Sequence, residues 1–286
     1  MILIADSGAT KTDWCFGNTL HDCQVVHTEG INPFHLTEEK IKQILQESLI
    51  LQLPFPKEEV KAVFFYGAGC TPEKAGKLSG LLAEAFPHAT IQVESDLLGA
   101  ARALCKHQPG IACILGTGAN SCLYDGQRIT HNTPPLGYIL GDEGSGAYLG
   151  KRFVGDCIKQ QLSSDLLEGL LKEYNLTIPD ILDKVYRQPQ GNRFLARLTP
   201  YIYKHKNQPE VREFLIECFS EFFRRNILSY PEHNRIPVSF VGSIAWFFQD
   251  ELKETAREFN LHTGIFIQSP IQELKGFHLS EKRKCV

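Results

Sequence analysis

A strand–turn–strand pattern occurs twice in this 286-residue chain, and the repeat constrains the fold more than any other feature. In the first copy, the apolar run Ile2–Ala5 leads into a small polar turn that contains Gly8. In the second copy, the apolar run Ile111–Leu115 leads into a similar turn around Gly118, about 110 residues later. Internal repeats are the sequence signature of repeated structural units. We therefore expect two lobes on one plan, with the two turns facing each other across a cleft.

Strand and helix signals elsewhere indicate an α/β protein. A buried strand is expected at 62–66 and a helix at 73–86, whose leucines recur at helical spacing. The chain is mainly helical after residue 150, and the last strand signal is at 238–241. A chain of this length lies where single hydrophobic cores stop growing, which also favours two lobes. We place their boundary between residues 106 and 107.

Composition and charge exclude several classes of function. The formal net charge is -3 and the basic residues are scattered, so the sequence offers no electrostatic surface for nucleic acid or for an anionic membrane. No apolar stretch approaches the roughly 20 residues that span a bilayer. Ile2–Ala5 lacks a preceding basic region and ends at Asp6, which does not fit a signal peptide. We expect a cytoplasmic protein with reduced cysteines, since its nine cysteines form no C-x-x-C pair.

The first turn carries groups that bind phosphate. Residues 6–12 offer successive backbone N–H groups, hydroxyls and the Lys11 ammonium, and Gly8 lets the backbone approach a bulky anion. Asp6, at the end of the strand, is placed to bind Mg²⁺ directly or through water. A plain hairpin is the alternative interpretation of the same residues.

The second turn repeats this chemistry in a weaker form. Gly116, Thr117 and Gly118 combine small residues with a hydroxyl after an apolar strand, which alone is also compatible with a plain turn. Two such turns on matching units together favour a nucleotide phosphate as the ligand. The motifs G-x-x-x-x-G-K-[ST], strand-borne G-x-G-x-x-G, G-x-S-x-G and H-E-x-x-H are absent from the sequence.

Other polar residues are candidates for substrate binding and catalysis. Asp142 and Glu143 lie between glycines before a predicted helix, and buried carboxylates are costly unless they meet donors, a sugar or a metal. An exposed acidic helix start is the alternative. Asp96 follows a short strand, where open α/β sheets bind ligands, although a strand-end aspartate is also a common helix cap. Asn32 precedes a proline and could bond sugar hydroxyls or act only as a turn residue.

Six segments, taken in order, resemble the BadF/BadG/BcrA/BcrD ATPase family and, within it, the eukaryotic-type N-acetylglucosamine kinases. They are DSGATKTDW, EGINPF, VESDLLGAARAL, ILGTGANSCLY, LGYILGDEGSGAYLG and FVGSIA, and the resemblance runs from Met1 to about Gln272. It implies two ribonuclease H-like (actin-like ATPase) lobes, with mixed sheets flanked by helices around a central cleft. Residues 1–106 would form an N-terminal lobe with the first phosphate turn and the catalytic aspartate. Residues 107–286 would form a C-terminal lobe with the second phosphate turn and the adenosine site.

The resemblance also implies an ATP- and Mg²⁺-dependent kinase that phosphorylates the 6-hydroxyl of an N-acetylated amino sugar, with N-acetylglucosamine as the leading substrate. Asp96 would be the catalytic base and Asp6 the metal ligand. The implied nucleotide-binding residues are Asp6, Gly8, Thr10, Lys11, Thr12, Gly116, Thr117, Gly118, Gly242 and Ser243. The implied sugar-binding residues are Asn32, Asp96, Ala119, Asn120, Leu136 and Asp142.

Three departures from the family's pattern leave details open. The kinases often have two glycines where this chain has Val241 and Gly242, so the adenosine pocket is less defined. Leu136 stands where the mammalian kinases carry tryptophan, with Tyr138 nearby, which makes N-acetylmuramic acid an alternative substrate. The chain is also shorter at its end, where residues 281–286 offer no obvious closing helix.

Two other classes of function are weighed against the kinase. A dehydratase activator of the same family would couple ATP hydrolysis to an iron–sulfur cluster, which needs gathered thiolates, and the cysteines here are scattered. A sugar- or nucleotide-sensing protein would bind its ligand without turnover. The presence of Asp6, Asp96 and both turns favours the kinase. The sequence leaves the oligomeric state open, with a homodimer compatible with it.

Overall fold

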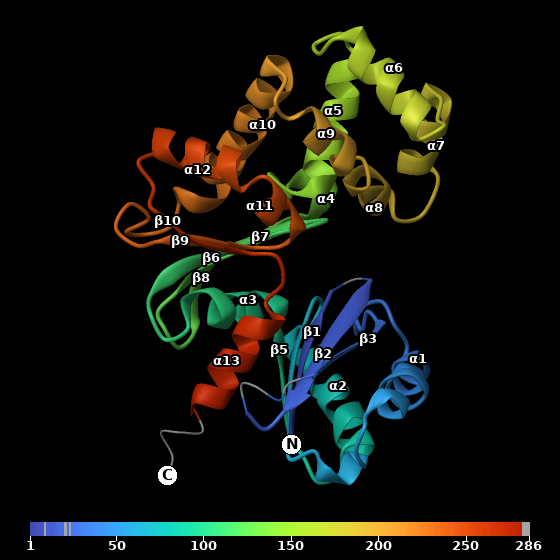
Figure 1. Cartoon of the computed structure of the whole chain (residues 1–286), viewed down its shortest axis with the longest axis vertical. Helices are drawn as coiled ribbons and strands as arrows, with labels where there is room; N and C mark the ends of the chain where they lie inside the picture. Colours follow the sequence, from blue (N-terminus) through green and yellow to red (C-terminus); the bar gives the residue numbers. More distant parts are fainter. Residues whose placement is uncertain (9, 20–21, 23, 282–286) are drawn as a thin grey trace. The chain divides into compact units, whose positions relative to one another are not determined.

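Two compact units, each with one five-stranded mixed sheet, make up the chain in the computed structural model (Figure 1). Unit 1 comprises Met1–Gln108, Gly126–Arg128 and the chain from Ser269 onward, and unit 2 comprises Pro109–Asp125 and Ile129–Gln268. The structure describes residues 1–8, 10–19, 22 and 24–281. The predicted fold class, two lobes with mixed sheets flanked by helices, is confirmed.

The sheet of unit 1 has the strand order β3-β2-β1-β4-β5. Its strands are β1 (Ile2–Ser7), β2 (Lys11–Gly17), β3 (Gln24–Glu29), β4 (Ala62–Gly67) and β5 (Thr90–Ser95). β1 pairs antiparallel with β2 and parallel with β4, and β4 pairs parallel with β5. The carboxyl ends of three parallel strands therefore meet at one edge, where the register aligns Ser7, Gly67 and Ser95.

One face of this sheet is covered by the helices that precede β4 and β5 (Figure 1). They are α1 (Glu38–Gln43), the π-helical turn η1 (Ile44–Leu49), the 3₁₀ turns η2 (Ile50–Gln52) and η3 (Lys57–Glu59), and α2 (Pro72–Ala85). Thr37 caps α1 by accepting a hydrogen bond from Lys40 N at 3.3 Å, as its position predicts. Leu78 and Leu82 of α2 are fully buried in the same apolar cluster as Trp14.

The opposite face of this sheet holds α3 (Asp96–Cys105) and the C-terminal helix α13 (Ile271–Glu281). His278 of α13 stacks on Phe64 with ring centroids 3.7 Å apart, and its Nε2 lies 2.7 Å from the Tyr66 hydroxyl. These contacts place α13 in unit 1, whereas the predicted division assigned everything after residue 106 to the second lobe. The expectation that residues 281–286 offer no closing helix falls, apart from Glu281, outside the described residues. Helical periodicity shows which face of a helix is buried, but it does not show which sheet receives that face.

Unit 2 repeats the plan with the strand order β10-β9-β6-β7-β8. Its strands are β6 (Gly110–Leu115), β7 (Ala119–Tyr124), β8 (Ile129–Thr133), β9 (Val238–Val241) and β10 (Thr263–Ile267). β6 pairs antiparallel with β7 and parallel with β9, as β1 does with β2 and β4. The expectation that 238–241 is the last strand is wrong. β10 is a short edge strand with a glycine and the half-exposed Ile265, so its strand signal is weak.

Helices fill most of the rest of unit 2. They are α4 (Gly137–Leu140), α5 (Gly146–Ile158), α6 (Ser164–Glu173), α7 (Ile178–Tyr186), α8 (Gly191–Ala196), α9 (Thr199–His205), α10 (Pro209–Phe222), the π-helical turn η4 (Phe223–Ile227), α11 (Ser243–Phe247) and α12 (Gln249–Glu258). Phe153, Phe219 and Phe240 from a helix, a second helix and a strand are fully buried in one core. This core fixes the start of α5, which forms part of the candidate site.

No described helix is long and apolar enough to cross a membrane. Six of the described cysteines are free thiols, namely Cys70, Cys105, Cys113, Cys122, Cys157 and Cys218. Cys15 is disulfide-bonded, so the expectation of reduced thiols is wrong at this position.

Candidate active site

The first turn joins β1 to β2 and is held by its own hydroxyls. Gly8 N donates to Lys11 O at 3.0 Å, and the Ser7 hydroxyl lies 2.7 Å from the Thr12 hydroxyl. Ile31 N donates to Ser7 Oγ at 2.9 Å, which ties the turn to the segment after β3. Ser7 and Thr12 are fully buried, whereas Thr10 is exposed. Of the predicted phosphate-binding side chains, Thr12 is thus occupied within the protein, and Thr10 and Lys11 are open to solvent.

Asp6 is the last but one residue of β1 and is half-buried. Its pKa is raised to about 7, first by burial and then by the negative charges of Asp13 and Asp96, while Lys11 lowers it. Three carboxylates near one ammonium leave this edge of the sheet short of positive charge.

A bound Mg²⁺ at Asp6 would supply the positive charge that this edge of the sheet lacks. Among the described residues, no group of three or more His, Cys, Asp or Glu is arranged to hold a metal ion. Mg²⁺ rarely needs such a group, because it binds through one or two carboxylates and completes its coordination with water and phosphate oxygens. Asp6 can therefore serve as the protein ligand that the sequence predicts.

Asp96 is the first residue of α3 and follows directly after β5. The cap is Ser95, whose hydroxyl accepts from Leu98 N at 3.2 Å, so Asp96 is not needed for that purpose. Asp96 Oδ1 accepts from Leu97 N at 2.9 Å. Burial raises the pKa of Asp96, and the hydrogen bond from Leu97 N opposes that rise. A raised pKa makes a carboxylate a better proton acceptor near neutral pH.

A close contact between α3 and β4 sets the position of Asp96. A Cβ atom on Gly99 would lie 2.9 Å from the Cβ and ring atoms of Tyr66, so only glycine lets the helix approach this strand. Arg102 Nη1 donates to the Tyr66 hydroxyl at 2.7 Å. The helix that carries Asp96 is thus fixed at two points to the centre of the sheet.

Asn32 lies in the loop between β3 and α1. Its Oδ1 accepts from Phe34 N at 2.9 Å, and its backbone oxygen accepts from His35 N and Leu36 N. Gly69, with φ +76°, lies so close to the Asn32 side chain that a Cβ there would collide with it. This residue therefore has the turn role that the sequence offered as the alternative, and a sugar contact stays a prediction.

The second turn joins β6 to β7 and is held by the start of α5. Gly146 N donates to Gly116 O at 2.8 Å, and Ala147 N donates to Thr117 O at 3.0 Å. On β7, Asn120 Oδ1 accepts from Asn132 Nδ2 at 2.9 Å. The predicted residues Gly116 to Asn120 are therefore brought together with the glycine-rich segment before α5.

Asp142 reaches this turn from the loop before α5. Its Oδ1 accepts from Ala119 N at 3.3 Å, and its φ is +55°, a conformation that is uncommon for residues other than glycine. Burial raises the pKa of Asp142 to about 6, against the opposing hydrogen bond from Ala119. As expected for a buried carboxylate, Asp142 accepts a hydrogen bond from a protein donor. The alternative, an exposed acidic helix start, is excluded because Asp142 is buried.

Glu143 is buried beside Asp142 and is held from the π-helical turn η4. Asn226 Nδ2 donates to Glu143 Oε2 at 3.3 Å, and Arg225 Nε lies 3.8 Å from Oε1. Lys151 of α5 donates to Tyr138 O at 2.8 Å. Burial lowers the pKa of Lys151, and the charges of Glu143 and Asp142 oppose that fall. Sequence reasoning missed these three basic and amide residues, since nothing local relates η4 to residue 143.

Gly242 and Ser243 follow β9, as the predicted adenosine motif requires. Gly242 has φ +120°, and a Cβ there would collide with Leu115 O. Its N–H donates to Ile267 O at 3.1 Å. Leu136, at φ +61°, is 63% exposed at the start of α4. The structure thus packs Gly242 against the end of β6, directly before the second turn.

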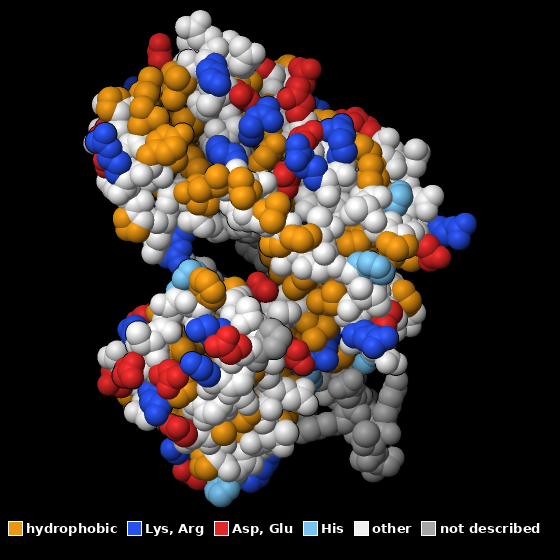
Figure 2. Space-filling view, turned by 180° about the vertical axis from the view of Figure 1, so that it is seen from behind, with side chains coloured by type: hydrophobic (Ala, Val, Ile, Leu, Met, Phe, Trp, Pro, Cys, Tyr) orange, Lys and Arg blue, Asp and Glu red, His pale blue; other side chains and the backbone are white. Residues whose placement is uncertain are grey.

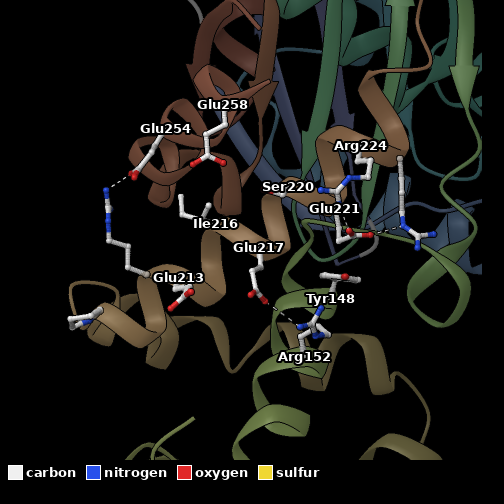
Figure 3. A pocket seen from close by; sticks show the side chains of 13 residues that line it. Tyr148, Arg152, Glu213, Ile216, Glu217, Ser220, Glu221, Arg224, Glu254 and Glu258 are labelled. Carbon is white, nitrogen blue, oxygen red and sulfur yellow. Dashed lines mark hydrogen bonds and ion pairs between the residues drawn. The ribbon is translucent and has the colours of Figure 1, made fainter. Parts of the chain in front are cut away.

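Two grooves on unit 2 are lined by none of the predicted site residues, although Arg225 lines one of them and Tyr138 and Lys151 line the other. One, of about 850 Å³, runs along α10 and is lined by Arg and Glu side chains that pair with each other, such as Arg152 with Glu217 (Figure 3). The other, of about 510 Å³, is lined mainly by apolar residues of α4, α5 and α7, and hydrophobic side chains gather on the surface in this region (Figure 2).

No family model matches the chain, and no curated protein sequence matches it. Among solved structures, one from Porphyromonas gingivalis has a TM-score of 0.95 and 44% sequence identity, and the match covers 99% of this chain and 100% of that chain. The chain belongs to the family of that protein. The P. gingivalis protein is named a putative N-acetylglucosamine kinase.

More distant structures in this comparison share the fold alone. A Chromobacterium violaceum protein with the same name has a TM-score of 0.75 at 20% identity, covering 96% of this chain and 98% of that chain. A ROK family glucokinase from Streptomyces griseus, in complex with glucose and AMPPNP, has a TM-score of 0.57 at 12% identity, covering 96% and 97%. The family therefore has the two-lobed fold of the sugar kinases. Membership of the BadF/BadG/BcrA/BcrD family stays a prediction.

Proposed function

We propose that this protein is a cytoplasmic, ATP- and Mg²⁺-dependent kinase that phosphorylates the 6-hydroxyl of an N-acetylated amino sugar, with N-acetylglucosamine as the leading substrate. The observation that carries the proposal is the half-buried Asp96 at the end of β5, whose charge acts on Asp6 at the end of β1, directly before the first turn. A base, a metal ligand and a phosphate turn in one place are the parts that phosphoryl transfer needs. The 44% identity to the P. gingivalis protein supports the same activity.

Asp96 is the general base in this proposal. Leu97 N occupies its Oδ1, so Oδ2 is the oxygen that accepts the proton of the sugar hydroxyl. The raised pKa of Asp96 brings its basicity closer to the working pH. The hydroxyl oxygen then attacks the γ-phosphorus of ATP as its proton passes to the carboxylate, the bond from that phosphorus to the β–γ bridging oxygen breaks, and ADP leaves.

The two turns hold the nucleotide. Thr10 and Lys11 bind phosphate oxygens from the first turn, and Thr117 binds them from the second. Gly242 and Ser243 lie against the adenosine. Bound Mg²⁺ neutralises charge on the phosphates, and Asp6 is its protein ligand.

Asn32, Asn120 and Asp142 bind the sugar in this proposal, since their side chains combine acceptors and donors suited to hydroxyl groups. N-acetylmuramic acid, the alternative substrate, carries an additional lactyl carboxylate. Asp142 and Glu143 are buried anions, and they would repel that carboxylate. This electrostatic argument favours the neutral N-acetylglucosamine.

The experiment that tests the proposal is ADP release by purified protein with Mg²⁺-ATP and a panel of sugars. The panel contains N-acetylglucosamine, N-acetylmuramic acid, N-acetylmannosamine, glucosamine and glucose, and mass spectrometry with ³¹P NMR identifies the phosphorylated hydroxyl. We expect turnover confined to the N-acetylated sugars and a 6-phosphate product. Rapid ADP release without sugar would indicate an ATP-driven activator. ATP binding without turnover on any sugar would indicate a sensor.

A further inference from the structure

Asp13 is a buried carboxylate in the middle of β2 that the proposed reaction does not use. The register places it opposite Asp6 on β1 and opposite His27 on β3, so the three side chains point to one face of the sheet. Asp13 is only 5% exposed. A buried carboxylate is unfavourable unless its oxygens find partners, so the partners of Asp13 indicate what it does.

Both carboxylate oxygens of Asp13 are occupied. Lys11 Nζ lies 3.1 Å from Oδ2, and His27 Nδ1 lies 2.8 Å from Oδ1. The Lys11 and His27 side chains are 65% and 63% exposed, so two exposed groups converge on one buried anion. Lys11 and Asp13 are two residues apart in a strand, which puts them on the same face. His27 holds the anion from the neighbouring strand.

Simple electrostatics does not explain a carboxylate at this place. Asp13 lies close enough to Asp6 to raise the pKa of that residue, and its charge would also repel the phosphates of a nucleotide. An exposed ion pair contributes little to stability, so the contact with Lys11 does not offset this cost by itself. Asp13 can instead orient the ammonium of Lys11, which it contacts. A lysine side chain has four rotatable bonds, and a ligand that must order them loses affinity.

We propose that Asp13, braced by His27, is a positioning residue that holds the Lys11 ammonium at the first turn, where it meets the phosphates of ATP. The ammonium has three N–H donors. One is used by Asp13 Oδ2, and two are left for phosphate oxygens. The inference rests on the proposed function only in taking Lys11 as a phosphate ligand.

The test is calorimetric binding of ATP and of adenosine, at saturating Mg²⁺, to the wild type and to Asp13→Asn. Positioning predicts that Asp13→Asn weakens ATP binding by about two- to tenfold, because one long side chain must then be ordered on binding. Adenosine has no phosphates, so its affinity should stay the same. Removal of a negative charge without a positioning role would instead tighten ATP binding. Equal or tighter binding of ATP to Asp13→Asn overturns the proposal.

A double-mutant cycle separates positioning from a general structural effect. In a Lys11→Met background, Asp13→Asn should cause no further loss of ATP affinity, because the group that it positions is gone. The same loss in both backgrounds would overturn the proposal. Glu84→Gln removes the partner of the exposed Lys42 in the same unit and should leave both affinities unchanged.

Two further measurements keep the outcome unambiguous. If Asp13→Asn does not fold, His27→Gln changes an exposed side chain and should weaken ATP binding in the same direction by a smaller factor. Unchanged ATP affinity in that variant would count against the proposal. Sugar turnover by the wild type decides the proposed function separately. If the wild type phosphorylates a sugar and Asp13→Asn binds ATP as tightly as the wild type, the kinase is confirmed and the positioning role is overturned. If the wild type phosphorylates no sugar and Asp13→Asn binds ATP more weakly, the positioning role is confirmed and the kinase is overturned.

Discussion

The two turns share a backbone plan, but they obtain their charged groups in opposite ways. The first turn carries Asp6, Lys11 and Asp13 within eight residues of sequence. The second turn has no charged residue of its own and receives the carboxylate of Asp142, 23 residues later, on Ala119 N. The first turn is fastened by hydroxyls, whereas the second is fastened by the first N–H groups of α5. One turn therefore depends on local sequence and the other on loop conformation.

The largest expected effect concerns Asp96, the proposed general base, which lies in unit 1. Asp96→Asn should lower kcat by about 10²- to 10⁴-fold, because the amide cannot accept the hydroxyl proton. Binding of ATP and sugar should persist, as measured by calorimetry, because the amide has nearly the same shape. Glu94→Gln, two residues earlier on β5, is the matched control and should retain turnover. Near-normal turnover in Asp96→Asn would remove the assignment of the base.

The first turn and the junction between β9 and α11 should differ in their tolerance to an added methyl group. Gly242→Ala forces a Cβ into Leu115 O at φ +120°, so we expect unit 2 to lose about 1 to 3 kcal/mol of unfolding free energy. A Cβ on Gly8 meets only Lys11 O, at 3.7 Å, so Gly8→Ala should change stability little. Thermal and urea unfolding measure both. Equal losses in the two variants would mean that the first turn and the junction after β9 are equally constrained.

The raised pKa of Asp142 predicts a stability that depends on pH. The folded-state pKa is about 6 and the ordinary value is 3.8, so the folded protein binds more protons than the unfolded chain between these values. Stability from this residue therefore falls as pH rises from about 4 to about 6. Asp142→Asn should raise Tm relative to the wild type at pH 8 and by less at pH 5. A Tm difference that does not vary with pH would show that Asp142 is not strained in this way.

The smallest expected effect should be the same in both units. Ser95 caps α3 through Leu98 N at 3.2 Å, and Ser145 caps α5 through Tyr148 N at 3.1 Å. Replacing either serine by alanine should lower the free energy of unfolding by about 1 kcal/mol, because one helix N–H loses its acceptor. Urea unfolding measures both variants. A much larger loss for Ser145→Ala would show that α5 depends more strongly on its cap than α3 does.

Much of unit 1 could be predicted from sequence because its site is local. The turn from Asp6 to Thr12, the strand end before Asp96 and the cap of α1 at Thr37 all follow from short-range patterns. The contact between His27 and Asp13 was missed. The two-residue spacing of Lys11 and Asp13 in a predicted strand could have indicated that these two side chains lie on the same face. Their pairing with β3 needs the register of the sheet, which the sequence does not state.

Less of unit 2 could be predicted, because its site is assembled over long distances in sequence. Asn226 reaches Glu143 across 83 residues, and the π-helical turn that carries Asn226 has no clear sequence signature. The short edge strand β10 and the helix α13 were missed for a related reason. The burial of each depends on partners that are distant in the chain.

The return of α13 to the first sheet has a consequence for synthesis on the ribosome. Residues 109–268 contain all of unit 2, so that unit has its strands and helices once this stretch has emerged. Unit 1 begins before unit 2 but lacks His278, the stacking partner of Phe64, until unit 2 has been synthesised. The sheet that is made first is thus covered only after the second unit is made, and a chain that stops before α13 would carry a finished second unit and an uncovered face on its first sheet.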